Sequence, residues 1–317
     1  TEAKGWHNPQ VLPYAPLQIN PAASVLHYGQ ALFEGMKAFR QHDGRVVLYR
    51  PEFNCDRLHE GAERLCMEAP PKEMMMQGIR ELVKKDVDFV PAQKGCALYI
   101  RPTLIGTEGF LGVRPSHEYL FFVILSPVSA YYQGGLTPIR IWVEEKYVRA
   151  APGGLGATKA GANYAASLRA ALEAKKKGYA QVLWLDPTHQ YVEEVGTMNV
   201  FFVINGEVVT PALNGSILAG GVRESAITVL RDWGYKVTER RISIHEVAEA
   251  IFAGTLTEAF GTGTAAVISP VGELHFGGQA HLINGSKMGE LSQRLYDEFT
   301  ALQFGEKPDT RGWFAEL

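Results

Sequence analysis

The chain has 317 residues, of which 46% are hydrophobic, and its formal net charge is −3 at pH 7. This length is sufficient for two domains or for one large domain. Charges of both signs are mixed along the sequence, with no basic stripe interleaved with aromatic residues, which excludes a nucleic-acid partner. No apolar run reaches transmembrane length and residues 1–13 carry no signal-peptide core, so we expect no membrane association. The three cysteines show no metal-binding spacing, which predicts reduced thiols, a cytoplasmic protein and no catalytic metal.

The first part of the sequence alternates between strand and helix patterns. We expect strands over residues 45–49, 97–104 and 119–125. Helices are expected over residues 51–66 and 72–89, and the first of them begins with a proline that suits a first turn. A segment with Pro127 and the pair Gly134-Gly135 then breaks the pattern. We therefore predict a first domain over residues 1–128 and an interdomain linker over 129–138.

The second part has clearer start and stop signals. Strands are expected over residues 139–144, 181–185, 199–204 and 207–210, and Asn205-Gly206 predicts a hairpin turn between the last two. A helix over 162–177 ends in three lysines before a glycine, which suits the negative end of a helix dipole. Two further helices are expected, one from the Gly220-Gly221 pair to about residue 233 and one from a capping box at Ser243 to residue 254. We therefore predict a second domain over 139–317, and a fold of two mixed α/β domains.

A lysine in a loop of small residues is the first candidate for chemistry. Lys159 lies in the run PGGLGATKAGANY (152–164), which has no neighbouring acid. Most lysines in such loops are solvated surface charges. A phosphate-binding P-loop is rejected, because Thr158 and Ala160 stand where glycine and a hydroxyl residue are needed. The remaining possibility is a nucleophile, since burial lowers the pKa of a lysine and only the neutral amine attacks a carbonyl.

A pair of adjacent carboxylates is the second candidate. Glu193 and Glu194 stand between an aliphatic strand pattern and a glycine, in the run YVEEVGTMN (191–199). In strict alternation they face opposite sides of a strand, so one points inward or the strand bulges. A solvated hairpin edge is the alternative.

Two glycine-rich segments and one arginine suggest places for an anion. The glycine pair in ILAGGVRES (217–225) opens a helix, whose first amides favour an anion, although an ordinary tight turn also fits. The run FGTGTAA (260–266) matches a dinucleotide pattern, but a strand and a proline follow it instead of a helix and an acid, so we reject that interpretation. Arg57 on the helix over 51–66 is either a surface charge or a fork for a phosphate. Together these parts suit pyridoxal 5′-phosphate (PLP), which needs an amine for its aldehyde, an acid for its ring nitrogen and a cradle for its phosphate.

The sequence also resembles a known family over nearly its whole length. The matching runs are LHYGQALFEGMKA (26–38), YIRP (99–102), KAGANY (159–164), EVGTMN (194–199) and GTGTA (261–265). It is similar to branched-chain amino acid aminotransferases of fold-type IV, nearest to the larger subgroup that includes the animal enzymes. The resemblance implies an α/β (α+β) fold with a small α/β domain followed by a larger pseudo-barrel domain that carries the PLP lysine. It also implies a cytoplasmic homodimer, with the site near the subunit interface, that acts in branched-chain amino acid biosynthesis.

The resemblance assigns roles to individual residues. Lys159 would form the Schiff base with PLP and then move a proton at the substrate Cα. Glu194 would pair with the pyridine nitrogen, and Tyr164 with the phenolic oxygen. The residues assigned to the phosphate are Arg57, Gly221, Val222 and Thr264. Thr197 and Thr262 are also assigned to cofactor binding.

The implied substrates are branched-chain L-amino acids and the pair 2-oxoglutarate and glutamate. Thr264 and Ala265 would receive the α-carboxylate. The expected wall of the apolar side-chain site consists of Tyr28, Phe33, Tyr99, Tyr131 and, from the partner subunit, Val113. Arg101 is our candidate for the second carboxylate of glutamate.

Other functions remain open at this point. A D-amino acid transaminase or an aminodeoxychorismate lyase would share the fold. A non-catalytic ligand-binding protein on this fold would be expected to lack Lys159 or Glu194, and both are present. A nicotinamide oxidoreductase is disfavoured because the glycine pattern lacks its context.

Overall fold

The structure is a computed structural model that describes residues 4–129 and 136–317. The chain folds into two compact units. Unit 1 comprises Thr1–Ala130, Thr158–Ala162 and Ala301–Leu317, and unit 2 comprises Tyr131–Ala157 and Asn163–Thr300. The predicted division at 1–128, 129–138 and 139–317 uses consecutive segments, and it stays a prediction. Most of the expected linker, from 130 to 135, lies outside the described residues.

Unit 1 is built on a six-stranded sheet in the order β1-β4-β2-β3-β15, with β5 pairing β4, and every pairing is antiparallel. The strands are β1 Ala31–Phe33, β2 Met36–Arg40, β3 Val46–Tyr49, β4 Ala97–Gly106, β5 Tyr119–Val128 and β15 Phe314–Glu316. The helical elements are α1 Ser24–Tyr28, α2 Pro51–Arg64, α3 Lys72–Lys85 and the 3₁₀ turn η1 Val87–Phe89.

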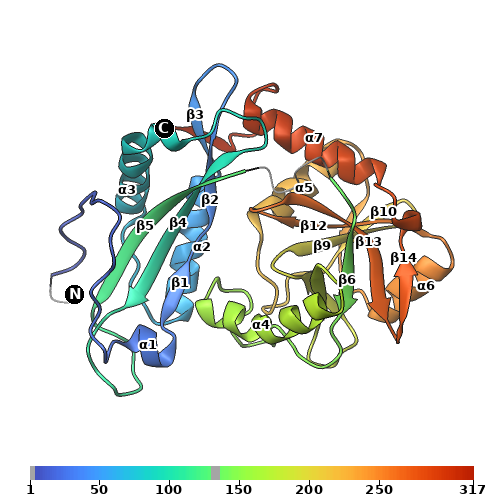
Figure 1. The fold of residues 1–317 in the computed structure, drawn as a ribbon, viewed down its shortest axis with the longest axis horizontal. Coiled ribbons are helices and arrows are strands. Elements are labelled where there is room, and N and C mark those ends of the chain that lie inside the picture. The colour runs from blue at the N-terminus through green and yellow to red at the C-terminus, as the bar shows by residue number, and fades with distance from the viewer. Residues whose placement is uncertain (1–3, 130–135) are drawn as a thin grey trace. The chain divides into compact units, whose positions relative to one another are not determined.

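Helices α2 and α3 pack on one face of this sheet (Figure 1). Buried side chains of both helices form one apolar core with side chains of β1 to β4. α2 begins at Pro51, as its sequence predicts, because a proline at the first helical position needs no backbone donor. The expected strand over 119–125 continues to Val128, and Pro127 pairs with Leu98 at the sheet edge. A proline is tolerated there because an edge strand has backbone groups that need no partner in the sheet.

Unit 2 contains a nine-stranded sheet in the order β11-β10-β9-β12-β13-β6-β7-β8, with β14 pairing β13. The strands are β6 Ile139–Val143, β7 Gln181–Leu185, β8 Val192–Val195, β9 Asn199–Ile204, β10 Glu207–Thr210, β11 Val237–Glu239, β12 Leu256–Gly263, β13 Val267–Phe276 and β14 Gln279–Leu282. The helical elements are α4 Gly161–Lys176, α5 Gly221–Asp232, α6 Ile244–Phe252, the 3₁₀ turn η2 Asn284–Ser286 and α7 Glu290–Phe304. Both α4 and α7 cross the division between the units.

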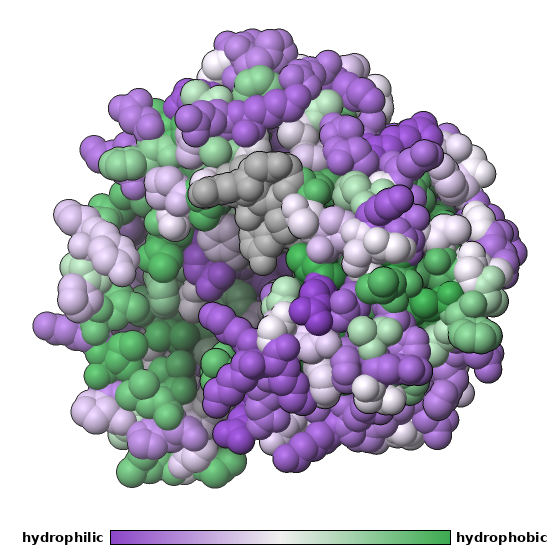
Figure 2. Space-filling model, turned by 45° about the vertical axis from the view of Figure 1, so that its right-hand side comes forward, coloured by the Kyte–Doolittle hydropathy of each residue, from purple (hydrophilic) through white to green (hydrophobic). Residues whose placement is uncertain are grey.

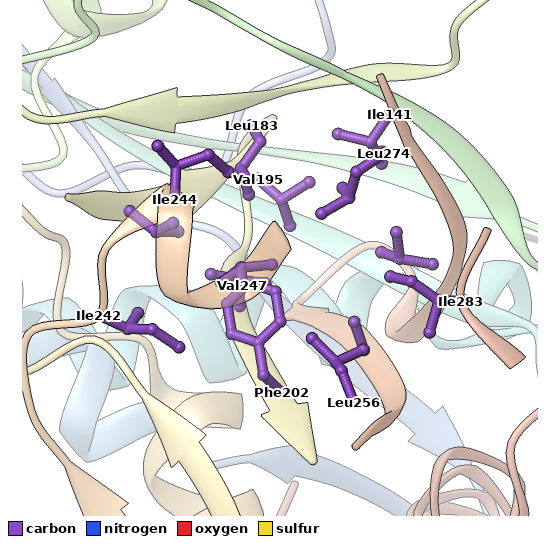
Figure 3. Close-up of a cluster of buried hydrophobic side chains, with 14 of the residues drawn as sticks. Ile141, Leu183, Val195, Phe202, Ile242, Ile244, Val247, Leu256, Leu274 and Ile283 are labelled. Atoms are coloured by element: carbon purple, nitrogen blue, oxygen red, sulfur yellow. The ribbon is translucent and has the colours of Figure 1, made fainter. Parts of the chain in front are cut away.

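The core of unit 2 lies between α6 and the strands. Figure 3 shows Ile244 and Val247 from α6 beside Phe202 from β9 and Leu256 from β12, and all four side chains are buried. The capping box predicted for α6 is confirmed, because the Ser243 side chain accepts a hydrogen bond of 3.0 Å from the Glu246 amide. This cap satisfies one of the amides that a helix start leaves without an internal partner.

The predicted hairpin between β9 and β10 is also confirmed. Asn205 and Gly206 both have positive φ, at 51° and 76°, as a two-residue turn of this type requires. In the described part of the chain, no helix is long and apolar enough to cross a membrane.

Candidate functional site

Lys159 is anchored to β1 through its backbone. Its carbonyl accepts a hydrogen bond of 3.2 Å from the Phe33 amide, and Ala160 forms a β-bridge with Leu32. The Lys159 amine lies 4.8 Å from the centre of the Phe33 ring. The segment of small residues thus continues the edge of the sheet and places the amine against an aromatic face.

The surroundings of the Lys159 amine favour its neutral form. The pKa of Lys159 is lowered from 10.5 to about 8, mainly by burial. The charges of Arg57 and Arg101 also lower this pKa, while Glu34 and Tyr99 oppose the shift. The lysine is therefore not the solvated surface charge that its loop composition would suggest. The lowered pKa raises the fraction of neutral amine at neutral pH, and the neutral amine is the form that acts as a nucleophile.

Arg57 and Glu34 form a buried ion pair in unit 1. The Arg57 Nε and Nη2 atoms each donate a hydrogen bond of 2.8 Å to Glu34. Both side chains are at least nine-tenths buried, with 9% and 1% of their surfaces exposed. Arg57 is therefore not a surface residue of α2, and its guanidinium is held at a fixed angle by the carboxylate.

Three of the predicted substrate residues lie together beside Lys159 in unit 1. The Arg101 guanidinium carbon lies 4.5 Å from the centre of the Phe33 ring, and Arg101 Nη2 donates a hydrogen bond of 2.8 Å to the Tyr99 hydroxyl. Gly35 leaves the space for Tyr99, because a Cβ at residue 35 would lie 2.1 Å from the Tyr99 hydroxyl oxygen. The strand sequence therefore builds a cluster of one aromatic face, one hydroxyl and one cation next to the amine.

Two other predicted substrate residues, Tyr28 and Val113, are more exposed. The Tyr28 hydroxyl donates a hydrogen bond to the Leu111 carbonyl. Tyr28 is 43% exposed and Val113 is 87% exposed. Tyr131 lies outside the described residues.

In unit 2, the pair of carboxylates is buried on a bulged strand. The pairing of β7 with β8 shifts register between Trp184 and Leu185, which leaves Glu193 as an extra residue opposite them. Glu193 and Glu194 are 1% and 3% exposed. Of the arrangements that the sequence left open, the strand takes the bulge, and the solvated hairpin edge is wrong.

Glu194 is held by one amide and one arginine. Its Oε1 accepts a hydrogen bond of 2.7 Å from the Leu218 amide and forms an ion pair of 3.1 Å with Arg149 Nη2. Arg149 also donates to the carbonyls of Gly156 and Ser216. The carboxylate of Glu194 is thus fixed by contacts to two loops of unit 2.

Glu193 holds the same loop from its other end. Its Oε1 accepts hydrogen bonds from the Ser216 hydroxyl and from Asn214 Nδ2, the latter at 3.2 Å. Its Oε2 is buried and has no hydrogen-bond partner among the described residues. The two adjacent acids therefore fasten residues 214–218 between them.

The predicted phosphate residues Gly221 and Val222 open α5. In the first turn of a helix the backbone amides have no acceptor within the helix, which makes this end suitable for an anion. A Cβ at Gly220 would lie 2.1 Å from Asn199 Oδ1. Since Asn199 Nδ2 donates a hydrogen bond of 2.9 Å to the Leu218 carbonyl, the glycine lets this loop pack closely on β9.

The other predicted cofactor residues lie on three elements of unit 2. Thr197 lies in the tight turn between β8 and β9, and Tyr164 in the first turn of α4. Thr262 is on β12, and its buried hydroxyl has no hydrogen-bond partner among the described residues. Thr264 and Ala265 form the turn from β12 to β13.

Sequence reasoning assigned no role to Glu34 or Arg149. Glu34 lies between two apolar stretches, and an isolated acid in that position is a signal that was available. Arg149 lies in an irregular segment with no periodic pattern, and its contacts with Gly156 and Ser216 join distant parts of the sequence.

These residues fit the chemistry of PLP. The described residues include a neutral-tending amine at Lys159, a buried carboxylate at Glu194, a buried guanidinium at Arg57 and a helix start at Gly221. The amine suits the aldehyde, the carboxylate suits the ring nitrogen, and the guanidinium and the helix start both suit the phosphate.

Comparison with known protein families supports the interpretation of these residues as a PLP site. Residues 31–274 match the family Amino-transferase class IV, and this stretch includes every predicted site residue except Tyr28. The chain belongs to the class IV aminotransferases. The predicted family is thereby confirmed.

Similar class IV aminotransferases come from several bacteria. The chain is 52% identical over 318 residues to the branched-chain-amino-acid transaminase 1 of Bacillus subtilis (strain 168), with 100% of this chain and 89% of the relative covered. It is 46% identical over 324 residues to the branched-chain-amino-acid aminotransferase of Mycolicibacterium smegmatis, with 100% and 88% covered.

Solved structures agree with this class. A branched-chain amino acid aminotransferase from T.th., solved with pyridoxamine 5′-phosphate, matches with a TM-score of 0.84 and 25% identity, over 96% of this chain and 95% of that one. The branched-chain amino acid aminotransferase of Escherichia coli matches with a TM-score of 0.79 and 28% identity, over 94% and 93%. The predicted mixed α/β fold of this family is confirmed.

Proposed function

We propose that this class IV aminotransferase uses PLP to exchange the amino group between branched-chain L-amino acids and the pair 2-oxoglutarate and glutamate. One observation carries the proposal: an identity of 52% to a branched-chain-amino-acid transaminase, over 100% of this chain and 89% of the relative. The half-buried Lys159, whose pKa is lowered, gives the chemistry its nucleophile. We place the enzyme in branched-chain amino acid biosynthesis.

Lys159 is the catalytic residue of the proposal. Bound PLP supplies an aldehyde and an electron-withdrawing ring. With a pKa of about 8, roughly a tenth of the Lys159 amine is neutral at pH 7, because each pH unit below the pKa is a factor of ten. The same amine would then take a proton from the substrate Cα and deliver it to the C4′ carbon of the cofactor.

Glu194 keeps the proton on the ring nitrogen in this proposal. Its ion pair with Arg149 and its hydrogen bond from the Leu218 amide support the role, since they fix the direction of the carboxylate. Tyr164 is proposed to donate to the phenolic oxygen of the cofactor.

The phosphate is proposed to bind Arg57, Thr264 and the amides of Gly221 and Val222. A helix start and a guanidinium fork both favour a dianion. Thr197 and Thr262 remain proposed cofactor residues, and the buried Thr262 hydroxyl supports this because it lacks a partner among the described residues.

The substrate side chain is proposed to lie against Phe33 and Tyr99, with Tyr28, Tyr131 and the partner's Val113 around it. Thr264 and the Ala265 amide would receive the α-carboxylate. Arg101 would receive the second carboxylate of glutamate. Its buried Nε has no hydrogen-bond partner among the described residues, which favours an incoming acceptor, because an unsatisfied buried donor costs about 1–3 kcal/mol.

We further propose that the enzyme is a cytoplasmic homodimer with its site near the subunit interface. Apolar side chains gather at the lower left of Figure 2. The large exposed apolar residues of unit 1 include Leu12, Tyr14, Leu26, Leu111 and Val113, each more than half exposed. So many exposed apolar side chains are typical of an interaction surface. The three free cysteines suit a reducing compartment.

The dimer is tested by sedimentation of Leu111→Asp beside the wild type. The control is Phe252→Asp, which changes a residue that is 95% exposed on α6 of unit 2, outside this apolar set. We expect the wild type and the control to be dimers and Leu111→Asp to dissociate. A monomeric wild type, or a Leu111→Asp dimer of unchanged stability, would argue against the proposal.

The catalytic proposal is tested with PLP and candidate substrates. The wild type should bind PLP with visible absorption, and borohydride should fix the cofactor to Lys159. Turnover with L-leucine, L-isoleucine and L-valine should exceed turnover with D-alanine or aminodeoxychorismate. A protein that stays colourless with added PLP would refute the cofactor assignment, whereas turnover of D-alanine or release of pyruvate from aminodeoxychorismate would favour the related enzymes.

A further inference from the structure

Glu34 is a buried acid at the junction between β1 and β2, and the proposed function gives it no role. Only 1% of its side chain is exposed. Its carboxylate accepts two hydrogen bonds of 2.8 Å from Arg57, one of 2.7 Å from Asn54 Nδ2 and one of 3.2 Å from the Gly35 amide. Three of these donors reach Oε2 and one, Arg57 Nε, reaches Oε1, so both oxygens of the carboxylate have partners.

The donors around Glu34 offset the cost of burying its side chain. Burying an unpaired carboxylate is strongly unfavourable, and pairing with hydrogen bonds offsets this cost. Two of the donors belong to a guanidinium and one to an amide side chain on the same helix, α2. The chain thus uses Glu34 to hold two neighbouring turns of α2 in relation to the β1–β2 junction.

The contact fixes the direction of the Arg57 guanidinium. Two of its nitrogens, Nε and Nη2, face the Glu34 carboxylate in a side-on fork. A guanidinium has five N–H donors in one plane, and this fork uses two of them. Fixing one edge of the plane therefore also fixes the direction of the other three donors, which lie on the edges turned away from Glu34.

The Phe53 ring is a further contact of the same guanidinium. The Arg57 guanidinium carbon lies 5.2 Å from the centre of the Phe53 ring. An aromatic face and a carboxylate fork together leave an arginine side chain little rotamer freedom. An arginine ordered in advance loses less entropy when an anion binds, and this raises affinity.

We propose that Glu34 is a positioning residue for the cofactor phosphate: it orients Arg57 through the side-on fork, so that the outer N–H donors of the guanidinium are in place for a phosphate. This inference rests on the proposed function, because it assumes that Arg57 binds the phosphate of PLP. Glu34 itself does not touch the cofactor. Its effect is specific for the phosphate group and requires Arg57.

The test compares PLP with pyridoxal, which has the same ring and aldehyde but no phosphate. Dissociation constants for both are measured by absorbance titration for the wild type, Glu34→Gln, Arg57→Ala and the double variant. We expect Glu34→Gln to weaken PLP binding at least tenfold, which equals about 1.4 kcal/mol, and to change pyridoxal binding less than twofold. In the Arg57→Ala background, Glu34→Gln should change PLP binding less than twofold, since coupled residues are not additive.

A matched control removes a carboxylate from another Glu–Arg pair. Glu273 is 7% exposed and forms an ion pair of 3.0 Å with Arg140 in unit 2. Glu273→Gln should leave both dissociation constants unchanged. Thermal unfolding of each variant tests whether it folds. If Glu34→Gln does not fold, Asn54→Ala provides the second variant, because it removes one hydrogen-bond donor to the same carboxylate. It should give a smaller loss of affinity that is also confined to PLP.

Three results would overturn the proposal. Equal losses for PLP and pyridoxal would mean that Glu34 only stabilises the fold. Additive losses in the double variant would mean that Glu34 does not act through Arg57. A wild type that binds neither compound and forms no borohydride-stable adduct at Lys159 would overturn the proposed function together with this inference, whereas the first two results would leave the proposed function standing.

Discussion

The lowered pKa of Lys159 predicts that this lysine destabilises the cofactor-free protein at neutral pH. Burial lowers its pKa from 10.5 to about 8. The folded protein therefore binds this proton less tightly than the unfolded chain does. The charged lysine lowers the free energy of unfolding, and this destabilisation is fully present below pH 8. The folded protein loses the proton near pH 8 and the unfolded chain near pH 10.5, so the destabilisation shrinks between these two pH values and is absent above them.

The size of the effect follows from the two pKa values. A difference of 10.5 against about 8 corresponds to about 3 kcal/mol, since one pKa unit equals about 1.4 kcal/mol. Lys159→Met removes the charge and keeps most of the side-chain volume. We expect the cofactor-free variant to be more stable than the cofactor-free wild type by about 1–3 kcal/mol at pH 7, because relaxation and water entry reduce the full penalty.

Urea denaturation of both cofactor-free proteins at pH 7, 8.5 and 10 measures this effect. Comparing the two proteins at each pH removes the contribution of every group that titrates equally in both. This matters because burial also lowers the pKa of Lys37 on β2 to about 8. A stability difference that does not shrink toward pH 10, or a variant that is less stable at pH 7, would refute the reasoning, because then Lys159 is either not desolvated or is stabilised by Glu34 more than burial destabilises it.

Three further substitutions test the site and the fold. Gly35→Ala places a Cβ 2.1 Å from the Tyr99 hydroxyl oxygen, so steady-state kinetics should show a higher KM for L-leucine in a protein with nearly unchanged unfolding. Arg101→Ala should reduce the glutamate half-reaction more than the leucine half-reaction in single-turnover measurements, and equal losses would remove Arg101 from the role proposed for it. Ser243→Ala removes the side-chain cap that accepts a hydrogen bond from the Glu246 amide. It should lower the free energy of unfolding by about 1 kcal/mol in urea denaturation without changing activity. An unchanged denaturation midpoint would mean that solvent replaces the cap.

Elements with local signals were predictable from the sequence. The hairpin at Asn205-Gly206 needs positive φ at two adjacent residues, and few residue pairs other than Asn-Gly adopt it readily. The cap at Ser243 likewise depends on a side chain and an amide only three residues apart. In both cases the interactions that decide the structure lie within one short segment, so the local sequence contains nearly all the information.

Elements whose burial comes from distant partners were not predictable in the same way. The residues of β2 are buried on both faces except Arg40, so they show no alternation of apolar and polar side chains. β15 has only three residues and pairs with β3 from the opposite end of the chain. The break expected after residue 125 failed for a related reason, since Pro127 is acceptable only because β5 is a sheet edge.

For the carboxylates of the site, residue types alone predict which residues matter, whereas the packing of the fold decides which partners they have. The sequence identified the Glu193–Glu194 pair and the two ways in which it could be accommodated, and the bulge on β8 buries both acids. Their partners are Arg149 and the loop over residues 214–218, which no periodicity connects to β8.

For Glu34, too, the sequence shows the acid and the fold decides its partners. A single acid in an apolar stretch signals that partners must exist, because a buried carboxylate without donors is too costly to keep. The identity of those partners, Arg57 and Asn54, depends on the placement of α2 against the β1–β2 junction. An isolated buried charge in a sequence therefore predicts that a polar network exists, while the fold decides which cation it orients, and here that cation is the arginine proposed for the phosphate.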